Sequence, residues 1–228
     1  MLLLAIDTSG TQGSIALARA DEAASRSKIE LIEVASLVGG KFSAQLVPQI
    51  SELLSHRALH IGDIGLLVAV SGPGSFTGLR VGLAAVKGLA EILQKPIVAV
   101  SMLELIAAAS DLSGKVLAAL DAGRSDVYVG EYEILADRAQ QSLKEAIVSR
   151  SEFLEYARAR AAATPDPAIA QAMRTAGYSI LLIPPISGEA VARLGWAKFQ
   201  LGHIITPELL DANYIRRTDA EILEKGRR

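Results

Sequence analysis

The sequence predicts an α/β fold of two related halves, each with a mixed sheet flanked by helices. Over residues 1–110, apolar runs and helix-periodic segments follow one another in the order β-β-β-α-β-α-β-α. This order combines a three-stranded meander with αβ units. The segment LLAIDTSGTQGSIALA (3–18) is then echoed by LAALDAGRSDVYVGEY (117–132), since in each an apolar strand ends in Asp before a polar turn and a second strand. An internal repeat of this kind indicates two similar halves.

The first half is defined by apolar periodicity and by the glycines that interrupt it. After Gly39 and Gly40, apolar residues recur at helical spacing and predict a helix over 42–57, which Ser43 can cap and which contains Pro48. The other elements expected here are strands at 2–6, 13–19, 28–37, 66–70 and 97–100, and helices at 75–93 and 102–110. We place a domain boundary after residue 105, which gives domains 1–105 and 106–228.

The second half has a less regular pattern after the repeated hairpin. Prolines interrupt the chain at 164–167 and 184–185. A helix over 189–201 is expected, with Ser187 as its cap. The charged tail, 216–228, is predicted to be a solvated helix.

Composition excludes several classes of protein. The 228 residues are 50% hydrophobic and 4% aromatic, with a formal net charge of -2, which is unlike a basic nucleic-acid binder. The absence of cysteine excludes disulfides, thiolate metal sites and Cys nucleophiles. No positively charged segment precedes the first apolar run, and no run approaches the roughly 18 residues that span a bilayer. We therefore expect a cytoplasmic protein that does not enter a membrane.

The loop SGPGSFTGLR (71–80) raises the question of phosphate binding. It follows a strand and precedes a helix, and Gly72, Gly74 and Gly78 would let a backbone approach an anion. The P-loop Lys is missing, and Thr77 stands where the dinucleotide fingerprint has its third Gly. A tight turn with close helix packing is the other interpretation.

The residues at the end of the first strand also allow two interpretations. Asp7, Thr8 and Ser9 could contact a Mg²⁺–nucleotide, or they could form an Asx turn that closes the hairpin. In the helix that follows the loop, Gly78, Gly82, Ala85 and Leu89 share one face. Small residues on a helix face indicate close approach, either of the sheet beneath or of another helix.

Other candidate chemistry is weak. His56 and His60 would share a helix face, but Arg57 stands between them where a zincin has its Glu, and a surface helix end is favoured over a metal site. Ser71 and Ser75 lie in no hydrolase motif. We expect no catalytic residue, no metal site and no cofactor in this chain on its own.

Four segments resemble the TsaB (YeaZ) family: AIDTS (5–9), SGPGSFTGLRVGLAAVKGLA (71–90), KPIVAVSMLELIA (95–107) and LDAGRSDVYVGEY (120–132). The resemblance is continuous over about residues 1–135 and resumes weakly at ANYIRRTDA (212–220). It implies the actin-like (ASKHA) fold of two ribonuclease-H-like halves.

The resemblance also implies a function. The chain would be a non-catalytic dimerisation subunit of the machinery that forms threonylcarbamoyladenosine on tRNA. Its partner would be a homologous TsaD-type subunit, which binds a metal and transfers the threonylcarbamoyl group, and a TsaE-type ATPase would join them. The chain would meet tRNA only through this complex and would form a homodimer when alone.

Two departures bear on this resemblance. TsaD-type chains carry a V-N-H-x-E-G-H type motif where this chain has 100–106, so that Met102 and Ile106 occupy the positions of the metal-binding histidines. Neither side chain suits such a metal. Phe42 stands where many relatives have His.

The resemblance assigns the helices over 42–57 and 75–93 to the partner interface. The residues we expect there are Leu46, Ile50, Phe76, Leu79, Arg80, Gly82, Leu83 and Val86. A degenerate phosphate loop would comprise Asp7, Thr8, Ser9, Gly72 and Gly74. The alternatives are a small ATP-binding kinase or ATPase that uses this loop, and a peptidase.

Overall fold

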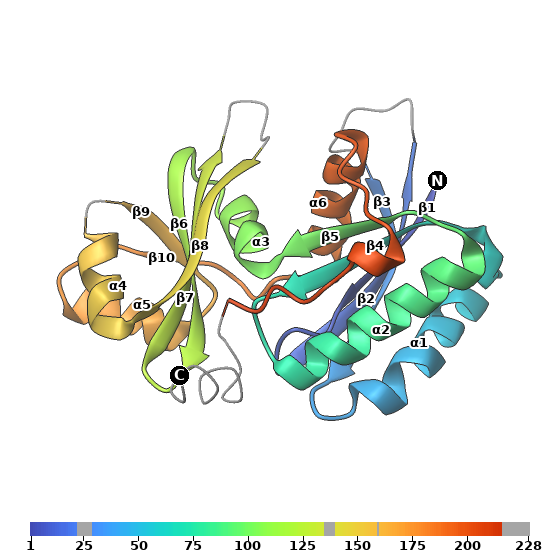
Figure 1. Cartoon of the computed structure of the whole chain (residues 1–228), viewed down its shortest axis with the longest axis horizontal. Coiled ribbons are helices and arrows are strands. Elements are labelled where there is room, and N and C mark those ends of the chain that lie inside the picture. Colours follow the sequence, from blue (N-terminus) through green and yellow to red (C-terminus); the bar gives the residue numbers. More distant parts are fainter. Residues whose placement is uncertain (22–28, 135–139, 159, 216–228) are drawn as a thin grey trace, which may run out of the picture. The chain divides into compact units, whose positions relative to one another are not determined.

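The computed structural model describes residues 1–21, 29–134, 140–158 and 160–215. Within these residues it contains two five-stranded sheets and their flanking helices (Figure 1). The predicted helix over 216–228 lies outside the described residues.

The first sheet has the strand order β3-β2-β1-β4-β5. Its strands are β1 (Leu2–Asp7), β2 (Gln12–Ala20), β3 (Ile29–Val38), β4 (Ile64–Gly72) and β5 (Ile97–Ser101). The meander β1–β2–β3 is antiparallel, whereas β4 pairs in parallel with β1 and with β5. The central strands β1 and β4 and the strand β5 are near-continuous apolar runs because helices bury both faces of the sheet there, whereas β3 at the edge alternates and is largely exposed.

Helices α1 (Phe42–His56) and α2 (Phe76–Leu93) cover one face of this sheet (Figure 1). Leu4 and Ile6 of β1 point to this side and join the core with Leu46 and Leu83 of the two helices. Pro48 lies inside α1, and α1 begins after Lys41 rather than with Ser43 as its cap. The N-cap of α2 is Ser75, whose hydroxyl accepts a hydrogen bond from the Gly78 N–H.

The opposite face of the first sheet is covered by α6 (Gly188–Gln200). Ser187 caps this helix, as predicted, by accepting from the Ala190 N–H. Two glycines allow its close approach. A Cβ added at Gly188 would lie 3.0 Å from the Ala16 Cβ, and one at Gly195 would lie 2.4 Å from a Val68 methyl group.

The second sheet has the order β10-β9-β6-β7-β8. Its strands are β6 (Gly114–Gly123), β7 (Asp126–Ile134), β8 (Gln140–Ser149), β9 (Ala161–Thr164) and β10 (Leu181–Leu182). The antiparallel hairpin β6–β7 continues into β8, and the parallel strands β9 and β10 lie beyond β6. Read from β8, this is the arrangement of the first sheet, so the repeat seen in the sequence corresponds to a repeated topology.

The remaining helices are short. They are α3 (Met102–Ala109), α4 (Arg150–Ala157), α5 (Pro167–Thr175) and the 3₁₀ turns η1 (Ile61–Asp63) and η2 (Pro207–Leu209). Phe153 of α4 and Met173 of α5 pack into the core of the second sheet with Leu117. Among the described residues, no helix combines the length and apolarity needed to cross a membrane.

The compact units differ from the two predicted domains. Unit 1 comprises Met1–Leu105 and Pro184–Ala212, and unit 2 comprises Ile106–Ile183 together with the described residues after Ala212. The domain predicted at 106–228 is therefore corrected, because α6 packs on the sheet of the first half. A contact between residues so far apart in sequence leaves no local signal.

Replacing Gly195 by Ala should destabilise the protein. The added methyl group would overlap a fully buried Val68, and overpacking costs about 1–3 kcal/mol. With a contact as short as 2.4 Å we expect a cost in the upper part of this range, above the gain of about 1 kcal/mol that Ala brings to a helix interior. At Gly88 of α2 an added Cβ meets nothing within 4 Å, so Gly88→Ala should stabilise. Thermal unfolding of the two variants checks this, and equal melting temperatures would contradict it.

Candidate partner-binding surface and glycine loop

The glycine loop packs against the turn between β1 and β2. Because β1 and β4 are parallel neighbours, their carboxyl ends meet at one edge of the sheet. The Ser75 N–H donates to the Ser9 carbonyl oxygen at 2.6 Å. The loop leaves β4 at Gly72, which has a φ of 113°, a value that favours glycine.

Asp7 forms the Asx turn that the sequence left as one of two interpretations. Its Oδ1 accepts hydrogen bonds from the Ser9 N–H at 2.8 Å and from the Ser9 hydroxyl at 2.6 Å. Burial raises the pKa of Asp7, and the two hydrogen bonds from Ser9 oppose this shift without cancelling it. The carboxyl group is thus engaged within its own turn.

Thr8 is wedged against the first two turns of α2. Its hydroxyl donates to the Gly78 carbonyl oxygen at 2.8 Å. A Cβ at Gly78 would lie 2.1 Å from the Thr8 carbonyl oxygen, and one at Gly82 would lie 2.2 Å from the Thr8 hydroxyl. Gly74 has the same relation to Ser9, with a Cβ-to-oxygen distance of 2.2 Å.

The structure brings the predicted phosphate-loop residues together. Their polar groups and the space beside the glycines are used in contacts among these residues themselves. Asp7, Thr8 and Ser9 are buried, and the glycines provide the space that the turn itself occupies. The N–H groups of Ser75 and Gly78, at the start of α2, already donate to Ser9 and to the Ser75 hydroxyl. The arrangement holds α2 in place on the sheet.

The predicted interface residues fall on two different faces of the helices. Six of them belong to the core or pack against the β1–β2 turn: Leu46, Ile50, Leu79, Gly82, Leu83 and Val86. Because these residues have almost no exposed surface in the single chain, their burial does not support the prediction that they contact a partner. Phe76, 40% exposed, and Arg80 do lie at the surface.

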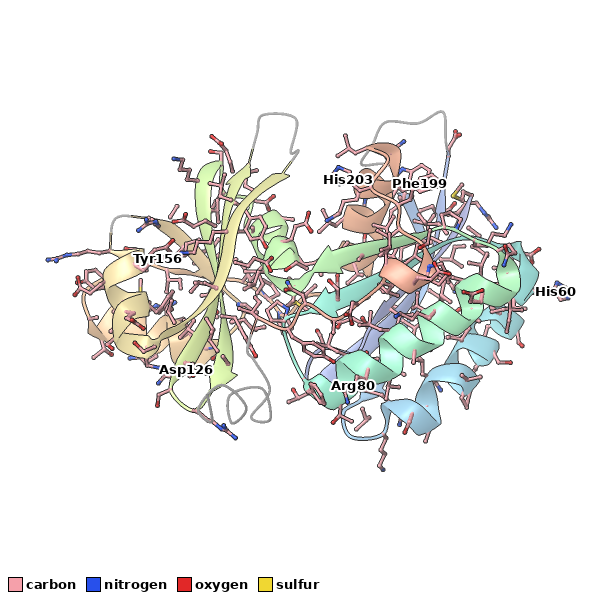
Figure 2. The ribbon with its side chains drawn as sticks, in the orientation of Figure 1. His60, Arg80, Asp126, Tyr156, Phe199 and His203 are labelled. Carbon is pink, nitrogen blue, oxygen red and sulfur yellow. The ribbon has the colours of Figure 1, made fainter. Side chains whose placement is uncertain are left out.

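Arg80, which Figure 2 labels near the start of α2, stacks on the ring of Phe76. The guanidinium carbon of Arg80 lies 3.7 Å from the centroid of the Phe76 ring. Such cation–π contacts contribute about 0.5–1 kcal/mol at exposed sites. The pair therefore presents an oriented cation beside an exposed ring.

The outward face of α1 and α2 was missed by the sequence analysis. It includes Val47 of α1, 67% exposed, and Ile92 of α2, 80% exposed. Between these apolar side chains it presents small residues, namely Ala44 and Ser51 of α1 and Thr77, Ala84 and Gly88 of α2. The sequence could have indicated this surface, because large apolar and small residues occur on the side of each predicted helix that is opposite its apolar stripe. We call this set of exposed residues the outer face.

The two histidines do not form a pair. His56 ends α1, where its Nδ1 lies 3.1 Å from the Glu33 Oε1, and the neighbouring Arg57 donates to the Glu33 Oε2 at 2.6 Å. These two contacts, that from Arg57 being the stronger, lower the pKa of Glu33. His60 lies beyond the helix, before η1 (Figure 2). The predicted shared helix face is therefore wrong.

The positions that the resemblance assigns to the metal-binding histidines of TsaD-type chains hold buried apolar side chains. Met102 and Ile106 both lie in α3. Glu104, between them, is engaged by the Lys198 ammonium of α6 at 2.6 Å. Within the described ranges, no group of three or more His, Cys, Asp or Glu side chains could hold a metal ion.

Phe42, Ser71 and Ser75 have structural contacts. The Phe42 ring lies within 3.2 Å of the positions that a Cβ would take at Gly13 and Gly78, so this residue fills the space beside the turn. The Ser71 hydroxyl donates to the Val100 carbonyl oxygen at 3.2 Å. The Ser75 hydroxyl accepts from Gly78 as the cap of α2.

Comparisons with known proteins point to one family. The model described as "TsaD: tRNA N6-adenosine threonylcarbamoyltransferase" matches residues 26–201. The tRNA threonylcarbamoyladenosine biosynthesis protein TsaB of Bacillus subtilis is 33% identical over 156 residues, which cover 68% of this chain and 65% of that protein. TsaB of Haemophilus influenzae is 35% identical over 134 residues, 58% of this chain and 53% of that protein. The chain thus spans between about half and two thirds of the length of these relatives.

Two solved structures have the same fold as this chain over nearly its whole length. A Pseudomonas aeruginosa structure described as an uncharacterized protein with similarity to peptidase YEAZ has a TM-score of 0.74 and 26% identity, covering 94% of this chain and 99% of that one. YeaZ from the same organism has a TM-score of 0.73 at 24% identity, covering 93% of this chain and 99% of that one. The chain thus has the fold of YeaZ, and its two sheets of the same topology confirm the predicted two-half architecture.

Replacing Asp7 by Asn should change how stability depends on pH. Because its pKa is raised in the folded chain, Asp7 contributes stability below its unfolded pKa, and this contribution is lost as pH rises through the folded pKa. Asp7→Asn keeps an acceptor for Ser9 and has no proton to lose. Its melting temperature relative to wild type should therefore be higher at about pH 8 than at about pH 4.

The partner of Asp7 provides a second variant for this test. Ser9→Ala removes one hydrogen bond that opposes the shift. The loss of stability between the two pH values should therefore be larger in Ser9→Ala than in wild type. If the melting temperatures of Asp7→Asn and wild type differ by the same amount at both pH values, the pKa of Asp7 is not raised in the folded chain.

Proposed function

Since the chain belongs to the family of the tRNA N6-adenosine threonylcarbamoyltransferase TsaD, and within it to the TsaB group, we propose that it acts in forming threonylcarbamoyladenosine on tRNA. Its role is that of a non-catalytic subunit that pairs with and activates a TsaD-type transferase. A TsaE-type ATPase joins the pair, and the chain meets tRNA only through the complex. On its own it needs no cofactor and forms a homodimer.

The observation that carries this proposal is the outer face. Val47 and Ile92 are large apolar side chains with most of their surface in water, on the side of the helices that faces away from the core. Covering such a surface is favourable by about 25 cal/mol per Å² of apolar area. The small residues Ala84 and Gly88 allow a partner helix to come close.

The chain lacks the side chains that a metal-dependent transferase would need at the corresponding positions, and this supports a non-catalytic role. At the positions that the resemblance assigns to the metal-binding histidines, α3 carries the buried apolar side chains of Met102 and Ile106. The glycine loop is in contact with the Asp7–Ser9 turn. The kinase or ATPase alternative gains no support, because the groups that it would use on phosphate already bond within the chain. A serine peptidase would need a general base beside its Ser nucleophile, whereas the Ser71 hydroxyl donates to a backbone carbonyl oxygen and the Ser75 hydroxyl accepts from a backbone N–H.

The test is co-purification with the TsaD-type protein of the same cell. Gly88→Arg places a long charged side chain on the outer face at a position with open space, so the fold should persist while pairing is lost. Gly82→Arg is unsuitable, because its Cβ would already overlap Thr8. Gln171→Arg on an exposed site of α5 is the matched control.

We expect wild type and Gln171→Arg to co-purify with the transferase and Gly88→Arg to lose at least about nine tenths of the complex, a change that corresponds to roughly 1.4 kcal/mol. Circular dichroism and thermal unfolding confirm that the variants are folded. If Gly88→Arg pairs with the transferase as well as wild type does, the interface with the transferase does not include the outer face. Absence of pairing by wild type would overturn the proposed function.

A further inference from the structure

Both helices of the outer face begin beside the same turn. Phe42 is the first residue of α1, and its ring lies within 3.2 Å of the place that a Cβ would take at Gly13 of β2 and at Gly78 of α2. Thr8, in the turn after β1, contacts the first two turns of α2. The two helices are therefore held against the sheet at one place.

The Thr8 hydroxyl fills a notch in α2 that the missing side chain of Gly82 leaves. A Cβ at Gly82 would lie 2.2 Å from the Thr8 hydroxyl oxygen, and 3.4 Å from both the Cβ and the methyl carbon of Thr8. These three atoms are the nearest neighbours of that position. One oxygen atom thus occupies the notch, and the rest of the Thr8 side chain lies at ordinary contact distance.

A hydroxyl lets α2 come closer to the turn than an apolar group would. The Thr8 hydroxyl donates to the Gly78 carbonyl oxygen at 2.8 Å. A carbon atom in its place would need about 3.3–3.6 Å from the same oxygen. Without the hydrogen bond, a side chain that filled the notch would therefore separate the start of α2 from the turn by about 0.5 Å more.

A shift of this size changes the shape of the outer face, because that face is built from two helices. Val47 belongs to α1, whereas Ala84 and Gly88 belong to α2, and Ala84 follows the notch by only two residues. A partner that packs on both helices stands away from α1 when α2 is raised. A gap of about 0.5–1 Å loses a quarter to a half of the dispersion attraction between the atoms concerned.

We infer that Thr8 is a positioning residue for pairing: its hydroxyl, seated in the notch at Gly82, sets the height of α2 at which the outer face fits the transferase. This inference rests on the proposed function, because it concerns the same surface. It gives the turn that resembles part of a phosphate site a use in recognition of a protein partner.

Exchanging the atoms in the notch tests the inference. Gly82→Ala places a methyl group on the Thr8 hydroxyl oxygen and should raise α2. Its dissociation constant with the TsaD-type protein, measured by isothermal titration calorimetry, should rise about tenfold. In the double variant Thr8→Ala/Gly82→Ala the oxygen is gone, and the added methyl group meets the Cβ of residue 8 at 3.4 Å. Pairing by the double variant should therefore return close to that of wild type.

A second pair of variants gives the same comparison without an added atom on the helix. Thr8→Val keeps the shape of the side chain but puts a carbon atom where the hydroxyl lies, so it should weaken pairing as Gly82→Ala does. Thr8→Ser keeps the hydroxyl and should pair like wild type. If Gly82→Ala does not fold, Thr8→Val and Thr8→Ser decide the question.

A structural control separates positioning from a general loss of stability. Ser187→Ala removes the cap bond of α6, on the opposite face of the sheet. Thermal unfolding should show that this variant is less stable than wild type, and calorimetry that it pairs equally well. Weaker pairing by Ser187→Ala would mean that pairing follows stability, and the inference would be overturned.

The remaining outcomes distinguish the inference from the proposed function. If wild type pairs with the transferase but Thr8→Val pairs equally well, or if the double variant pairs no better than Gly82→Ala, the inference is wrong and the proposed function stands. If wild type does not pair at all, both are wrong.

Discussion

The contact between Thr8 and the first two turns of α2 determines which side of α2 is buried and which side is exposed to solvent. Gly78 and Gly82 have no side chains where Thr8 lies, and the Thr8 hydroxyl bonds to the Gly78 carbonyl group. The helix therefore lies low on the sheet, with its apolar side filled by the core. Thr8 thus fills the space beside the glycines of the loop that resembles a phosphate site. The same contact holds α2 on the sheet, so that the opposite side of the helix lies at the surface.

The order of the elements could be predicted from the sequence, because each is specified by its own residues. Apolar runs predicted the central strands, and Ser187 accepts the capping bond predicted for it, whereas α1 is preceded by Lys41 rather than capped by Ser43. The repeated strand–Asp–turn–strand pattern corresponds to two sheets of the same topology. The return of α6 to the first sheet could not be predicted, since it depends on the fit of Gly195 against Val68.

The candidate site was predicted less well, for a physical reason. Apolar periodicity marks the face of a helix that is buried, and a helix on a sheet buries that face within its own chain. Leu46, Leu79 and Val86 therefore belong to the core, whereas the outer face, with Gly88 and Ile92, has only a weak pattern. The histidines were misplaced because α1 ends at His56, and helix ends are poorly specified by local sequence.

The position of α6 in the chain has a consequence for synthesis on the ribosome. The strands of both sheets lie before residue 183, but the helix that covers one face of the first sheet begins only at Gly188. A nascent chain that ends before this point carries the apolar residues Leu3, Ala5 and Val68 on an uncovered sheet face. The five strands of the second sheet and the helices α4 and α5 have been made at that moment, although the second unit also includes residues after Ala212. The first sheet is thus made early but covered late, and its uncovered face depends on protection from aggregation in the interval.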